Sequence, residues 1–103
     1  MTYSITKAAE ARQLLVDLRQ ILVDQGEANW RRGIEAAIGE LSNSDGSLNA
    51  SGFGAARSIY NTMMAGGRGF AEYYISKASE DERIAANDVL DDLRSKTWSV
   101  FDL

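Results

Sequence analysis

The sequence predicts an all-α fold, a small bundle of four to five short amphipathic helices within one domain spanning residues 1–103. Apolar residues recur at three- and four-residue steps in four separate stretches, which is the spacing of one face of an α-helix. No proline interrupts these stretches. With 45% hydrophobic and 25% charged residues, the chain is too apolar to be disordered and long enough to enclose one core.

The first helix is expected from about Thr6 to about Gln25, with Gly26 as its C-terminal cap. One stripe of apolar side chains should face the core: Ala8, Ala11, Leu15, Leu18 and Leu22, flanked by Leu14 and Ile21.

A second apolar line lies on the same helix, apart from that stripe. It consists of Ala9, Val16 and Val23, which are seven residues apart. Either the C-terminal segment or a second copy of the chain would cover it, and we favour the C-terminal segment because that apolar segment needs a surface to pack on.

Asn29 is a good N-cap for the second helix. The apolar positions of this helix follow the helical period: Trp30, Ile34, Ala37, Ile38 and Leu41. Residues 42–51 are polar and contain glycine, so we expect a solvent-facing loop there.

The third helix has an apolar face and should stop at Gly66. The residues of that face are Phe53, Ala56, Ile59, Tyr60, Met63 and Met64. The dense glycines of residues 66–70 predict a structural turn, with an anion site beside Arg68 as the alternative. Residues 70–75 permit a short strand or a helical turn, and we favour the turn.

Ser79 and Glu82 form a capping box, which predicts the start of a fourth helix running to about Lys96. Its buried face should comprise four apolar residues: Ala86, Val89, Leu90 and Leu93. Residues 98–103 are too apolar for a free tail, so we expect them to dock on the bundle.

The chain lacks cysteine and histidine altogether. Disulfides, thiolate nucleophiles, the usual transition-metal ligands and the usual general base are thereby excluded. Residues 41–52 do not fit a calcium loop, because Gly52 stands where the bidentate glutamate belongs. We therefore expect no catalytic residue, no cofactor and no metal, and a protein that is not an enzyme.

The N-terminal residues lack a basic stretch followed by an apolar core, and no apolar run approaches the length of a membrane span. We therefore expect a cytoplasmic protein. Eleven Lys and Arg against fifteen Asp and Glu give a net charge of −4, which repels nucleic acid and anionic membranes. The charge favours a basic protein partner instead.

At the helical period, four carboxylates of the predicted fourth helix share a face opposite Val89 and Leu93, with Ile84 among them. They are Asp81, Asp88, Asp91 and Asp92. Carboxylates around one exposed apolar side chain are suited to a basic pocket on a partner, with Ile84 as the anchor. The alternative is an ordinary solvated helix face.

Residues 59–75 resemble a family of small bacterial helical proteins in which an apolar helix ends in a Gly-Gly-x-Gly turn, here Gly66-Gly67-Arg68-Gly69, before a short aromatic segment. The upstream Asn29-Trp30-Arg31-Arg32 belongs to the similarity. Such proteins are similar in size and acidity to immunity proteins, which cover the active site of a bacterial toxin.

The resemblance implies a protein that neutralises a basic toxin domain through its acidic face and the turn at Arg68, without catalytic residues. The alternative function is a helical adaptor or assembly subunit acting through homo-oligomerisation. We expect the chain in isolation to be a monomer or a homodimer.

Overall fold

The computed structural model of the chain describes residues 4–65 and 69–103. These residues form four α-helices, α1 (Ile5–Asp24), α2 (Asn29–Glu40), α3 (Phe53–Met64) and α4 (Glu80–Val100). Two short 3₁₀ turns, η1 (Ala50–Gly52) and η2 (Phe70–Glu72), precede α3 and follow it. The described residues contain one isolated β-bridge and no strand. The predicted all-α fold is confirmed.

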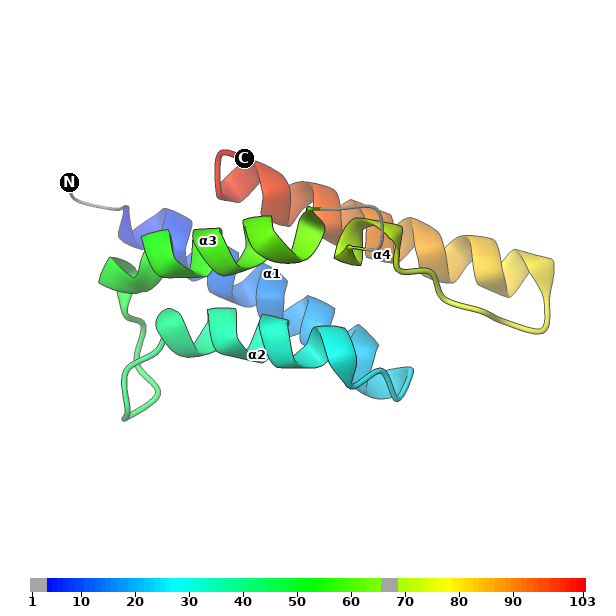
Figure 1. The fold of residues 1–103 in the computed structure, drawn as a ribbon, viewed down its shortest axis with the longest axis horizontal. Helices are drawn as coiled ribbons and strands as arrows, with labels where there is room; N and C mark the ends of the chain where they lie inside the picture. Colours follow the sequence, from blue (N-terminus) through cyan, green and yellow to red (C-terminus); the bar gives the residue numbers. More distant parts are fainter. Residues whose placement is uncertain (1–3, 66–68) are drawn as a thin grey trace.

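The helices form an elongated bundle of 46 × 27 × 22 Å. Helix α1 packs against α2 and α4, and α2 packs against α3. Along the long axis, the first half of α4 extends beyond the ends of the other three helices (Figure 1). No residue of the range 80–89, in this projecting part of α4, is buried.

Helix α1 begins at Ile5, one residue before the predicted start, because the Ser4 hydroxyl accepts the Lys7 amide at 3.3 Å and caps the helix. The predicted stripe is buried, with Ala8, Ala11, Leu15, Leu18 and Leu22 fully enclosed.

The predicted cap at Gly26 is confirmed. Gly26 has φ +67°, and its amide donates to the Val23 carbonyl at 3.1 Å while the Glu27 amide donates to the Leu22 carbonyl at 2.9 Å. These two bonds satisfy carbonyls that the end of a helix otherwise leaves without donors.

The predicted N-cap of α2 is wrong. Asn29 is the first helical residue, and Ala28 occupies the cap position without a side-chain bond. The carboxylate of Glu27 instead accepts the amides of Asn29 at 3.2 Å and Trp30 at 2.7 Å. The turn at Gly26 brings this carboxylate to the start of α2, where negative charge is stabilising. Ile34, Ala37 and Leu41 are buried as predicted, and Trp30 and Ile38 partly so.

Residues 42–51 form the expected polar loop, which is closed by a bridge between Ser42 and Leu48. Helix α3 then begins after Gly52, where a Cβ would overlap the carbonyl of Glu40, so only glycine permits this close approach to α2. Phe53, Ala56, Tyr60 and Met63 are buried, and Ile59 and Met64 are partly so.

Helix α3 ends at Met64, with Ala65 as its C-cap. The predicted stop at Gly66 and the alternative anion site beside Arg68 both lie outside the described residues. Residues 70–72 form a helical turn, as favoured over a strand, and the chain continues to α4 without regular structure.

Helix α4 begins at the predicted cap, where the Ser79 hydroxyl accepts the Glu82 amide at 3.3 Å, but it continues past Lys96 to Val100. The prediction for Val89 is wrong, since this side chain is 55% exposed. The stripe facing the bundle is Leu90, Arg94, Thr97 and Val100, with Ala86 and Leu93 partly buried. The buried face of α4 was predicted wrongly because two of its residues, Arg94 and Thr97, are polar and do not appear in an apolar pattern.

The C-terminal segment docks on the bundle as predicted. Phe101 is fully buried, with its ring centroid 5.1 Å from that of Phe53 and 5.8 Å from that of Tyr60. The guanidinium of Arg57 donates to the Phe101 carbonyl at 2.7 Å. The segment therefore packs largely against α3.

The C-terminal segment does not cover the second apolar line of α1, contrary to our expectation. Ala9 is exposed, Val16 is half-buried and Val23 is 43% exposed. This line lies on the solvent side of α1, away from the stripe that faces the core.

Candidate functional site

The carboxylates predicted to share one face of α4 do so, and together with Ile84 we call them the acidic face. Its members are Asp81, Ile84, Asp88, Asp91 and Asp92, and every one of them is exposed. Ile84 is 49% exposed, which is unusual for a large aliphatic side chain flanked by charges. The projecting half of α4 carries Asp81, Ile84 and Asp88, and the segment that connects η2 to α4 runs alongside it (Figure 1).

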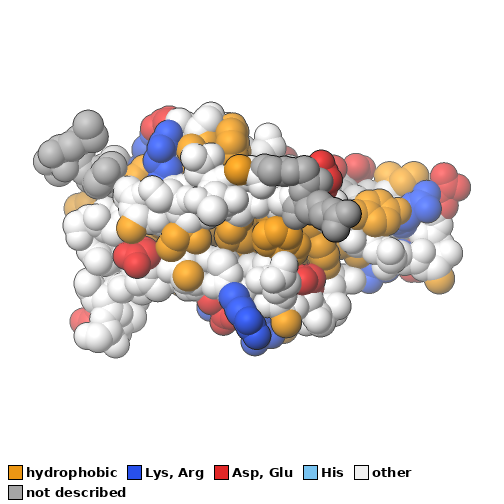
Figure 2. Space-filling model, in the orientation of Figure 1, with side chains coloured by type: hydrophobic (Ala, Val, Ile, Leu, Met, Phe, Trp, Pro, Cys, Tyr) orange, Lys and Arg blue, Asp and Glu red, His pale blue; other side chains and the backbone are white. Residues whose placement is uncertain are grey.

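The spacing along the helix makes Ile84 a neighbour of two carboxylates, since it lies three residues after Asp81 and four before Asp88. The first turn holds Glu80, Asp81 and Glu82, where the helix dipole favours negative charge. Figure 2 shows carboxylates at this projecting end of the molecule, with a basic side chain beside them. Arg83 pairs with Glu80 there at 3.7 Å, so Ile84 is an exposed apolar side chain among charges that are mostly negative.

Ion pairs divide the acidic face into two parts. Asp91 pairs with the buried Arg94, and Asp92 pairs with Lys96 at 2.8 Å. The hydrogen bond and negative charge of Asp92 raise the pKa of Lys96 above its usual value. Within residues 4–65 and 69–103, no ion pair involves Asp81 or Asp88. These two carboxylates are the ones whose charge is available to a partner.

Two exposed apolar residues in this region were missed by the sequence analysis. Val89 was assigned to the core, and Tyr74, which is 53% exposed, was not considered as a contact residue. The side chain of Asn87 accepts the Ile75 amide and donates to the Ile75 carbonyl, each at 2.9 Å, and so fixes the segment before α4 against the helix. Ile75 is buried in this arrangement, and its neighbour Tyr74 is exposed. Arg68, the remaining predicted contact residue, lies outside the described residues.

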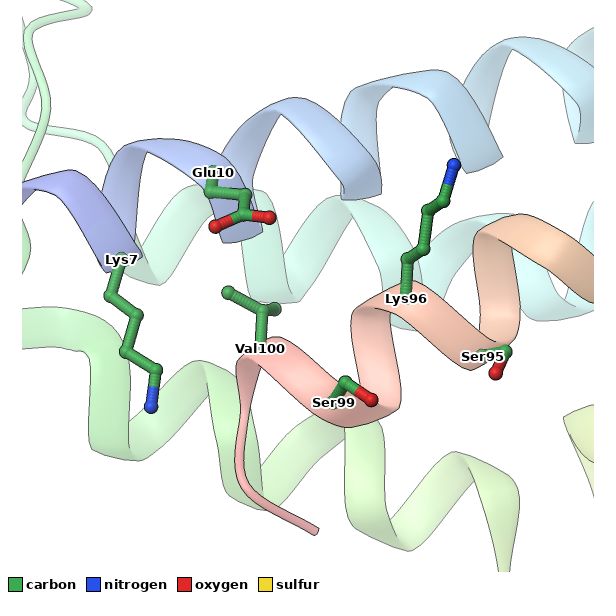
Figure 3. A pocket seen from close by; sticks show the side chains of 6 residues that line it. All are labelled: Lys7, Glu10, Ser95, Lys96, Ser99 and Val100. Atoms are coloured by element: carbon green, nitrogen blue, oxygen red, sulfur yellow. The ribbon is translucent and has the colours of Figure 1, made fainter.

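A shallow depression of about 370 Å³ lies between α1 and the last turns of α4 (Figure 3). Its lining residues are Lys7, Glu10, Ser95, Lys96, Ser99 and Val100. Each lysine is already ion-paired, Lys7 with Asp102 and Lys96 with Asp92. The ammonium groups point away from each other, so the side chains do not converge on one point as the groups of a reaction centre would (Figure 3).

In the described part of the chain, no helix has the length and apolar character needed to cross a membrane. No three side chains among the described Asp and Glu residues gather closely enough to hold a metal ion.

Comparison of the whole chain with protein-family models, curated proteins and solved structures found no match. The resemblance to immunity proteins therefore stays a prediction, and the surface of the chain is the basis for a proposed function.

Proposed function

We propose that this chain is a binding protein that neutralises a basic bacterial toxin by covering its active or binding site, as immunity proteins do. The observation that carries the proposal is the acidic face of α4, where Asp81 and Asp88 flank the exposed Ile84 on a part of the helix that projects from the bundle. A cytoplasmic location belongs to the proposal, and the absence of cysteine fits it.

The acidic face would act in two steps. At long range, the unpaired carboxylates attract a positively charged surface and raise the rate of encounter. On contact, Ile84 enters an apolar pocket of the partner and loses its water, while Asp81 and Asp88 pair with basic side chains around that pocket. Inhibition then comes from occlusion and requires no change in any covalent bond.

The test is binding to toxins encoded beside the gene for this chain. Isothermal titration calorimetry should show tight association at a fixed stoichiometry, and co-expression should protect cells from the toxin. Failure to bind or protect against every neighbouring toxin would remove the immunity function from consideration.

A second candidate function is a homo-oligomeric adaptor or assembly subunit. The observation that favours it is the apolar line of Ala9, Val16 and Val23, which the fold leaves on the solvent side of α1. Light scattering distinguishes the two candidates, because a stable oligomer that Ala9→Glu with Val23→Glu converts to a monomer would support the adaptor. A monomer at all concentrations would exclude it.

A further inference from the structure

A second depression, of about 240 Å³, opens on the surface at the junction of α2 and η2. Its lining residues are Trp30, Gly69, Glu72 and Tyr73. Trp30 and Tyr73 are both half-buried, so part of each aromatic side chain faces solvent. The depression thus combines two aromatic side chains with a carboxylate.

The aromatic side chains are fixed from beneath by Phe70, which is fully buried. The ring centroid of Phe70 lies 5.8 Å from that of Trp30 and 6.1 Å from that of Tyr73. Arg94 lies against the same ring, with its guanidinium carbon 5.5 Å from the centroid. The two outer aromatic side chains are therefore held in place before any ligand arrives.

Charges of both signs act on these aromatic side chains. Glu72 is exposed at the edge of the depression and supplies a negative charge there. Burial is the main cause that raises the pKa of Tyr73, the negative charge of Glu27 raises it further, and the positive charge of Arg94 lowers it. No lysine or arginine is among the described residues that line the depression.

The C-terminal end of α3 lies against Gly69, which is itself buried. A Cβ on Gly69 would lie 2.8, 3.0 and 2.5 Å from the carbonyl oxygens of Met63, Met64 and Ala65. The last turn of α3 contains no basic residue. The negative end of this helix dipole therefore lies beside Gly69 without a compensating charge from its own last turn.

We propose that this depression is a binding site for a guanidinium group, carried by an arginine side chain of a protein partner. Aromatic faces attract a cation, and the carboxylate of Glu72 can accept the hydrogen bonds that a guanidinium donates in its plane. A quaternary ammonium would leave this acceptor without a donor. The site is separate from the acidic face of α4, and it rests on the proposed function only in naming a protein as the source of the arginine.

The test follows the two indole N–H signals by NMR while N-acetylarginine methylamide is added up to about 100 mM, a range suited to one weak side-chain site. The neutral control is N-acetylcitrulline methylamide, which has nearly the same shape, at matched ionic strength. Free arginine forms a third arm, since a site for the free amino acid would prefer it to the capped form. Trp98, which lies on α4 and does not line the depression, serves as the internal control.

We expect the arginine derivative to shift the Trp30 signal in a saturable manner and leave the Trp98 signal in place. Glu72→Gln should weaken binding about threefold, as expected for one exposed charge pair, whereas Glu40→Gln on the exposed end of α2 should leave it unchanged. Tyr73→Leu should weaken binding and Tyr73→Phe should retain it, with the Trp98 signal reporting that both variants are folded.

Equal shifts from the citrulline derivative would show a merely apolar depression and overturn the proposal. An unmoved Trp30 signal throughout the titration would overturn it too, as would stronger binding of free arginine. Because only small molecules are used, these outcomes do not depend on whether the chain neutralises a toxin.

Discussion

At residue 94, a guanidinium group lies where the period of α4 requires a buried side chain. Arg94 donates to the carbonyl oxygens of Phe70 at 2.5 Å and Tyr73 at 2.9 Å, and it pairs with Asp91. Its side chain is only 8% exposed. Arg94 therefore fastens η2 to α4, and Asp91 has a structural role in addition to its place on the acidic face.

Replacing Arg94 with methionine keeps the apolar part of the side chain and removes its donors. The Tyr73 carbonyl then loses the Arg94 donor, the Phe70 carbonyl keeps only the Tyr73 amide, and we expect the free energy of unfolding to fall by about 3 kcal/mol. Urea denaturation followed by circular dichroism measures the change. In the control, Lys96→Met removes an exposed ion pair and should have little effect; equal losses in both variants would contradict the role of Arg94.

The buried Tyr60 should make the free energy of unfolding depend on pH in the alkaline range. Its buried hydroxyl donates to the Arg94 carbonyl at 3.1 Å, and burial raises its pKa above the ordinary value of a tyrosine. The folded chain therefore holds this proton more tightly than the unfolded chain does. The resulting stability is complete below the unfolded pKa of about 10 and is lost as the pH rises above it.

Tyr60→Phe removes this titration, so above pH about 10 its free energy of unfolding should decline less steeply than that of the parent chain. Urea denaturation between neutral and alkaline pH tests the difference. Parallel pH profiles would show that the Tyr60 proton is not linked to folding.

At the scale of single elements, two glycines, Gly26 and Gly39, have opposite roles. Gly26 ends α1 in the left-handed region at φ +67°. Gly39 lies inside α2, and a Cβ added there would meet no atom within 4 Å. The same substitution should therefore change stability in opposite directions at the two positions.

Gly26→Ala should destabilise the chain by about 1 kcal/mol, because alanine is strained at positive φ. Gly39→Ala should stabilise it by about 0.5 to 1 kcal/mol, because alanine has the higher helix propensity. Thermal unfolding of the two variants provides the measurement. A stabilising effect at Gly26 would argue against the cap that ends α1.

The helices were predictable from sequence because three of them carry clear apolar stripes, and Gly26 and Ser79 mark their ends with local signals. The cap at Glu27 was not predictable, since it depends on a turn that brings a carboxylate back to the next helix. The inner face of α4 was misplaced because Arg94 and Thr97 are buried there as polar residues. Only tertiary contacts reveal that burial.

The acidic face was easier to predict than the buried face of the same helix, because the helical period alone places exposed charged residues, with no need to know the tertiary contacts. The pairing of Asp91 with Arg94 and the availability of Asp81 and Asp88 required the structure. The aromatic depression also required it, since Trp30 and Tyr73 are distant in sequence and meet through Phe70.

At the scale of the whole molecule, the charge of −4 and the projecting half of α4 act together. Residues 80–100 contain six carboxylates and three basic side chains, so much of the excess negative charge lies on one helix. Because this helix extends beyond the bundle, the charge lies where the proposed basic partner would meet it first. This surface is the proposed contact region.

The most direct test is the affinity of Ile84→Ala with Asp88→Lys for the proposed partner, a basic toxin encoded beside the gene, measured by calorimetry against a matched control. The control, Ile5→Ala with Glu40→Lys, has the same change in net charge and the same loss of an isoleucine on exposed sites outside the acidic face. We predict about a hundredfold loss of affinity in the first variant and none in the control, with both folded. Equal affinities in the two variants would contradict the account.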